Sequence, residues 1–97
     1  MSKLLSESTR ETAMRQLANV EQSIAEYRAN PATNVWRLQL ALSSLAEAAI
    51  YAAKSECYQS AEQWRAEERD RAQAESADLM RALRAPVPGL RADVEAH

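Results

Sequence analysis

Few side chains in this sequence have the chemistry of a catalytic, metal-binding or cofactor-binding group. Histidine most often acts as the general base near neutral pH, and the single histidine, His97, is the final residue. The single cysteine, Cys57, has no histidine neighbour to activate it as a nucleophile, and one Cys with one His provides neither a zinc site nor an intramolecular disulfide. One glycine in the whole chain excludes a glycine-rich phosphate loop. The sequence therefore predicts no enzymatic activity, no metal and no other cofactor.

The residue types that dominate protein-binding hot spots are Trp, Tyr and Arg, and these are better represented. Tyr51 and Tyr58 lie one heptad apart and so share a helix face. Cys57 falls on an apolar stripe, where we expect a buried small side chain. Trp64 stands in a polar segment and is expected in the core of a bundle or a dimer. The candidate partner-binding residues are Trp36, Ile50, Tyr51, Cys57, Tyr58, Trp64, Arg65 and Arg69.

Nucleic-acid binding is the main alternative to protein binding. The chain has ten Arg and two Lys, with arginines grouped in residues 65–71 and 81–84. Arginine suits contacts with phosphates and base edges. However, the net charge is −2, Glu and Asp interleave with the first group, and Asp78 lies three residues before the second, so no uncompensated basic patch is predicted. We expect a protein partner, and a small DNA- or RNA-binding regulator stays as the alternative.

The elements that position these residues are predicted to be helices. Hydrophobic residues make up 46% of the chain and charged residues 27%, as in a folded domain, and one Gly with three Pro leaves too few turns for an all-β fold. Ser8 and Glu11 form a capping-box pattern that starts a helix over about 8–29. Asn30-Pro31 ends this helix in a turn over 30–34. No Gly or Pro interrupts 35–85, and 86–97 is a tail containing Pro and Gly that we expect to be extended or loosely ordered.

Two heptad seams predict an antiparallel helical hairpin within a single all-α domain over 1–85. Folded at 30–34, the seams pair in one register, from Tyr27 opposite Val35 to Ala13 opposite Ala49. The first seam is Ala13, Leu17, Val20, Ile24 and Tyr27, and the second is Val35, Leu38, Leu42, Leu45 and Ala49.

A second apolar stripe on 35–85 is left uncovered by this hairpin. In one solution the helix breaks near 55–60, with Ser60 and Gln63 as a capping box, and folds back into a three-helix bundle. In the other, the helix is continuous and two chains pair antiparallel about Cys57 as a homodimer. Because 55–60 contains no Gly or Asn, the sequence favours the continuous helix and the dimer. The stripe consists of Ala46, Ile50, Ala53, Cys57, Ala61 and Trp64.

Size and composition point to a general type of protein. With 20 Ala and an excess of Arg over Lys, the chain resembles small, motif-free helical proteins encoded by phages and mobile elements of GC-rich bacteria. The resemblance implies a non-enzymatic inhibitor or adaptor that covers a host machine, as anti-CRISPR inhibitors do. A structural oligomerisation module is a further alternative. Since the sequence has no apolar run of membrane-spanning length and no signal-peptide pattern, we expect a cytoplasmic location, in the host if phage-encoded, and no membrane contact.

Overall fold

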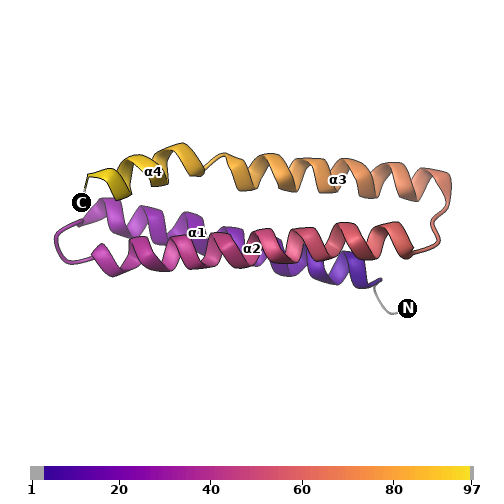
Figure 1. The fold of residues 1–97 in the computed structure, drawn as a ribbon, viewed down its shortest axis with the longest axis horizontal. Helices are drawn as coiled ribbons and strands as arrows, with labels where there is room; N and C mark the ends of the chain where they lie inside the picture. The colour runs from indigo at the N-terminus through magenta and orange to yellow at the C-terminus, as the bar shows by residue number, and fades with distance from the viewer. Residues whose placement is uncertain (1–3, 97) are drawn as a thin grey trace.

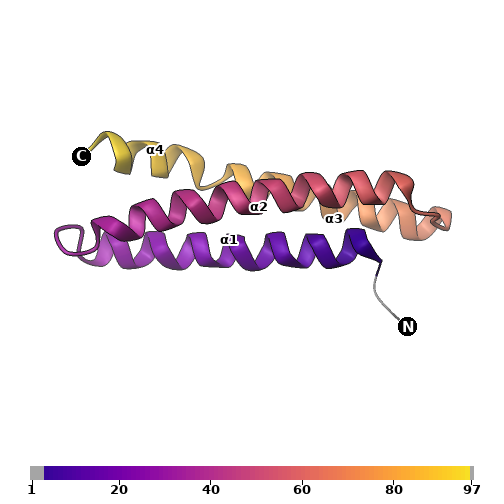
Figure 2. The same cartoon turned by 60° about the horizontal axis from the view of Figure 1, so that its bottom comes forward.

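Four helices form an elongated antiparallel bundle in the computed structural model, which describes residues 4–96 (Figures 1 and 2). The helices are α1 (Leu5–Ala29), α2 (Val35–Ala61), α3 (Ala66–Arg84) and α4 (Val87–Glu95). The described part of the chain contains no strand and measures 51 × 23 × 17 Å. The prediction of an all-α fold is confirmed, while the parts of the expected domain and tail at residues 1–3 and 97 lie outside the described residues.

The α1 helix begins earlier than the capping-box pattern predicts. It starts at Leu5, and the Ser8 amide already donates a helical hydrogen bond to the Leu4 carbonyl at 3.0 Å, so the predicted start at Ser8 is wrong. The amide of Ser6, which has no acceptor within its own helix, donates to Glu62 Oε2 at 3.4 Å. A carboxylate beyond the end of α2 therefore caps α1, and this tertiary contact extends the helix past its local signal.

The turn between α1 and α2 lies where Asn30-Pro31 predicts it. The residue before proline is driven out of the helical region, and α1 ends at Ala29. Asn34 makes no side-chain cap on its own helix, α2, but its Nδ2 donates to the Glu26 carbonyl at 2.9 Å. Glu26 lies in the last turn of α1, where carbonyls lack helical partners, so Asn34 ties the end of α1 to the start of α2.

The preference for one continuous helix over 35–85 is wrong, because α2 ends at Ala61 and the chain turns back over 62–65. The break lies beyond 55–60, and the expected Ser60–Gln63 capping box is absent: Ser60 Oγ donates to the Glu56 carbonyl within the helix. The turn contains no Gly or Pro. Instead, the Trp64 indole Nε1 donates to the Gln59 carbonyl at 3.1 Å, which satisfies one of the open carbonyls at the end of α2.

The α1 and α2 helices pack along their whole length, and α3 contacts both of them much more sparsely. The predicted α1 seam is largely confirmed, since Ala13, Leu17, Val20 and Tyr27 are buried and Ile24 packs against them. The predicted α2 seam is wrong at Val35, Leu42 and Ala49, which are exposed. The buried residues of α2 are Leu38, Ala41, Ser44, Ala48, Ala52 and Ser55.

The buried face of α2 differs from the predicted seam because α2 packs against more than one helix. The heptad seam on α2 was defined by its pairing with α1 alone, whereas the helix also packs against α3 and α4. The face of α2 that these neighbours share is centred on small side chains, which let helix backbones approach closely. As a result α2 is turned about its axis so that Ala and Ser, rather than Val35 and Leu42, lie inside.

The third rod of the bundle consists of α3 followed by α4, with a kink at Ala85 and Pro86 (Figure 1). Proline has no amide hydrogen and clashes with the preceding turn, so α3 ends just before it. The expected extended tail is wrong, because residues 87–95 form α4. Leu90 of α4 is only 2% exposed, and Arg28 of α1 holds Asp93 of α4 in an ion pair at 3.0 Å.

Candidate interaction surfaces

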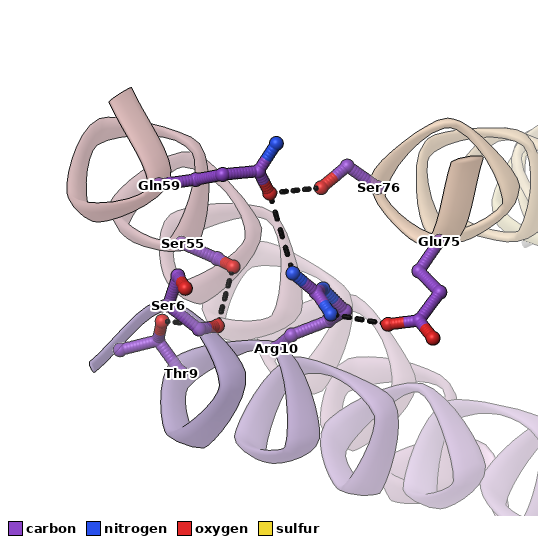
Figure 3. A network of polar contacts seen from close by, with 7 residues as sticks. All are labelled: Ser6, Thr9, Arg10, Ser55, Gln59, Glu75 and Ser76. Atoms are coloured by element: carbon purple, nitrogen blue, oxygen red, sulfur yellow. Dashed lines mark hydrogen bonds and ion pairs between the residues drawn. The ribbon is translucent and has the colours of Figure 1, made fainter. Parts of the chain in front are cut away.

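A network of polar side chains crosses the bundle where α1, α2 and α3 meet, near the start of α1 (Figure 3). Arg10 is at its centre and is only 6% exposed. Its guanidinium forms an ion pair with Glu75 of α3, and Nη2 donates to Gln59 Oε1 of α2 at 3.2 Å. Ser76 Oγ donates to the same Gln59 oxygen at 3.0 Å. The network is therefore a clamp that holds three helices through one buried cation.

A second polar contact lies beside this clamp. The hydroxyl of Ser55, on α2, donates to the Ser6 carbonyl of α1 at 2.6 Å (Figure 3). Both residues are fully buried, and their small side chains bring the two helices together. The buried Ser55 hydroxyl and the Arg10 Nη2 thus have hydrogen-bond acceptors, as buried polar atoms in folded proteins usually do.

The opposite feature, exposed apolar surface, lies on α2. We define the α2 outer face as the eight exposed residues Val35, Gln39, Leu42, Ala46, Ala49, Ile50, Ala53 and Cys57. They recur at helical spacing and none of them is charged, since the charged residues of α2 lie at positions 37, 47, 54 and 56. Ile50 is 55% exposed and Leu42 is 42% exposed. Large apolar side chains are thus aligned in solvent along most of α2.

Two of the predicted partner-binding residues, Ile50 and Cys57, lie together on the α2 outer face. Cys57 was expected to be buried, and this is wrong: it is exposed because α3 packs on another side of α2. Trp36, near the start of α2, is 54% exposed, and the Arg37 guanidinium stacks on its ring at 4.0 Å from the ring centre.

The other predicted residues are distributed over the rest of the bundle. Tyr51 is half-buried against the core with the Lys54 ammonium 5.3 Å from its ring centre, and Tyr58 is exposed. Trp64 is half-buried in the turn before α3, so its expected place in the core is wrong. Arg65 and Arg69 are exposed at the start of α3, next to the acidic residues of its first turn. They do not join the α2 outer face.

Sequence reasoning missed the residues of the clamp and four members of the α2 outer face: Val35, Leu42 and Ala49, which were assigned to the core, and Gln39, which was assigned to no face. Arg10 and Gln59 carry no recognisable motif, and their proximity depends on the turn at 62–65, which had no local signal. Val35 and Leu42 were assigned to the core because their spacing fits a heptad seam. One signal for the α2 outer face was available in the sequence. The stripe containing Ile50 and Cys57 carries no charge, and it lies on a helix whose other side is already covered.

Other types of site receive little support from the described residues. Within 4–96, no group of three or more His, Cys, Asp or Glu side chains is placed to hold a metal ion. Among the described helices, none is long and apolar enough to cross a membrane. Comparison of the chain with protein-family models, curated proteins and solved structures finds no match.

Proposed function

We propose that this chain is a non-enzymatic protein–protein interaction protein that self-associates through the α2 outer face and works as an adaptor or inhibitor by covering a partner surface. The observation that carries the proposal is the row of eight exposed, uncharged residues on α2. Contiguous apolar patches on soluble monomers are usually small, and extended ones mark interaction sites. From Val35 to Cys57 the row is about 33 Å long at 1.5 Å per residue.

A second copy of the chain fits this face in an antiparallel register. With Ala46 placed on the two-fold axis, Leu42 lies opposite Ile50 of the second copy, and Val35 lies opposite Cys57 of the second copy. Large side chains thus meet each other on both sides of the axis, and the small Ala46 at the centre permits close approach. A face with no charge fits its own copy without ion pairing, whereas a charged partner surface would lose hydration there with no compensation.

The break at 62–65 changes where such a dimer is centred. Pairing about Cys57 needs a helix that continues well past this residue, yet α2 ends at Ala61. Only residues 53–61 of the two α2 helices would then overlap. Pairing about Ala46 instead overlaps residues 35–57 and separates the two Cys57 side chains by about 33 Å. We therefore replace the Cys57-centred dimer with an Ala46-centred one.

Oligomeric mass and cross-linking test the proposal. We expect the wild-type chain to be a dimer by analytical ultracentrifugation, and Ile50→Glu to be a folded monomer because two glutamates per dimer would be buried without partners. Val94→Glu is the matched control, since Val94 is also exposed but lies on α4, and it should remain a dimer. A concentration-independent monomer mass for the wild type would overturn the self-association.

Cross-linking fixes the register. In a Cys57→Ser background, Ala46→Cys should form a disulfide-linked dimer under mild oxidation, because the two Cα atoms at the axis come within about 7 Å. The native Cys57 should not form this disulfide. Efficient cross-linking through Cys57 with none through the cysteine introduced at position 46 would show that the register is wrong.

A further inference from the structure

A groove separate from the α2 outer face runs between α1 and α3. Its volume is about 740 Å³, within the usual range for binding pockets of about 300–1,000 Å³. No residue of α2 lines it. The lining residues are Glu7, Arg10, Glu11, Met14, Leu17, Ala18 and Glu21 from α1, and Glu75, Asp78, Leu79 and Ala82 from α3.

The groove is elongated along the helix axes. On α1 the lining residues recur at three- and four-residue steps from Glu7 to Glu21, a length of about 21 Å at 1.5 Å per residue. On α3 they span about two turns, from Glu75 to Ala82. A groove of this shape accommodates a side-chain row of a helix better than a compact small molecule.

The floor of the groove is apolar. Met14 is 56% exposed there, and Leu79, Ala18 and Ala82 add further apolar surface from both helices. Methionine is flexible and polarizable, and it adapts to partner surfaces of varied shape. An occupant of this floor must therefore present a row of apolar side chains.

The rim of the groove is acidic. Five carboxylates line it, from Glu7, Glu11, Glu21, Glu75 and Asp78. Two of them pair with arginines, since Glu75 pairs with the buried Arg10 and Asp78 pairs with Arg81. The rim thus has an excess of negative charge, which attracts a basic partner and repels nucleic acid or an anionic membrane.

We propose that this groove binds an amphipathic helix of a partner protein, with an apolar row flanked by Lys or Arg. A second copy of this chain is a poor occupant, because none of its four described helices carries a net positive charge. This inference rests on the proposed role in protein–protein interaction and adds where the partner binds and what it looks like. The groove and the α2 outer face share no residue, so a dimer presents two grooves.

Binding of two designed peptides tests the inference by fluorescence anisotropy. The basic peptide is a helix of about fourteen residues, matching about 21 Å of groove, with Leu at helical spacing and Lys on both flanks. The acidic peptide has the same Leu row with Glu in place of Lys. We expect the basic peptide to bind at least about tenfold more tightly, with an affinity that falls as salt is added. Equal affinities would overturn the charge assignment.

Matched variants locate the binding site. Met14→Gln removes the exposed apolar floor, and Glu21→Gln removes one rim charge, and each should weaken the basic peptide while the circular dichroism melt shows an intact fold. Glu47→Gln, an exposed glutamate of α2 outside the groove, should leave the affinity unchanged. Basic-peptide binding that is indifferent to both groove variants, or absent altogether, would overturn the proposal. Spermine that competes as strongly as the peptide would instead assign the groove to polyamines and also overturn it.

The test separates this inference from self-association. Measured on Ile50→Glu, peptide binding should equal that of the wild type, because Ile50 does not line the groove. A chain that stays monomeric but binds the basic peptide would refute the dimer and support the groove. A chain that forms a dimer but binds neither peptide would refute the groove and support the dimer.

Discussion

Removing the charge of Glu75 should destabilise the bundle more than removing any other carboxylate of the same helix. The Arg10 guanidinium is almost fully buried, and Glu75 is its one ion-pair partner among the described residues. Glu75→Gln keeps the shape of the side chain and an oxygen that can accept a hydrogen bond, but it removes the negative charge beside the buried cation. The perturbation is therefore electrostatic and leaves the packing in place.

The size of the effect follows from the burial of the two groups. A pair of unit charges about 4 Å apart interacts by about 4 kcal/mol at an effective dielectric constant of about 20. The Glu75 side chain is 51% exposed, and water screens much of that energy. The expected loss in the free energy of unfolding is about 1–2 kcal/mol, above the ~0–1 kcal/mol of a surface pair and below the ~3–5 kcal/mol of a fully buried one.

Urea unfolding followed by far-ultraviolet circular dichroism measures this loss. A small domain with an m-value of about 1–2 kcal/mol per molar urea should show a midpoint lowered by about 1 M. Asp78→Asn is the control, because Asp78 pairs with Arg81 and both side chains are largely exposed, and it should change stability by less than about 0.5 kcal/mol. In an Arg10→Met background, Glu75→Gln should cost almost nothing. An equal loss for Glu75→Gln and Asp78→Asn would refute the clamp.

Two further predictions concern the third rod and the arginines. Leu90→Ala should lower the free energy of unfolding by about 2–5 kcal/mol, since Leu90 is almost fully buried, whereas Val94→Ala on the same helix should have little effect; equal losses in a thermal melt would show that α4 does not dock. Arg65, Arg69 and Arg71 are interleaved with Glu67, Glu68 and Asp70, so we expect no binding of duplex DNA or RNA at physiological ionic strength; a salt-sensitive complex lost in Arg69→Glu would instead support the regulator.

Local signals in the sequence predicted the parts of the fold that depend on neighbouring residues. Asn30-Pro31 placed the first turn, and the heptad spacing of α1 placed most of its buried face. The second turn could not be predicted in this way, because its contacts are the Trp64 indole on the Gln59 carbonyl and Glu62 on the Ser6 amide. Glu62 and Ser6 are distant in sequence, so helix propensities, which depend on neighbouring residues, cannot predict their contact.

Only part of the α2 outer face could be predicted from the sequence, because its extent depends on how α2 packs against other helices. Ile50 and Cys57 belong to a stripe that needed a cover, and both lie on the α2 outer face. Heptad spacing alone could not decide which face of α2 lies inward. Leu38 and Leu45 fit both the predicted seam, which contains Leu42, and the observed buried face, which contains Ala41 and Ala48. The packing of α3 and α4 on α2, in addition to α1, selects the face with the small side chains, and Leu42 is exposed to solvent.

The sparse packing of α3 gives the groove a movable wall. The α1–α2 hairpin contains most of the tertiary contacts, while α3 is held by the Arg10 clamp and a few buried side chains such as Leu79 and Leu83. Elements with few buried apolar contacts open locally before the whole domain unfolds, so amide hydrogens of α3 should exchange with solvent faster than those of α1 and α2. A helix seated between α1 and α3 binds the closed form alone, and mass action then slows exchange in α3 as the ligand concentration rises. Binding in the groove would therefore slow amide hydrogen exchange in α3 without changing the structure of this helix.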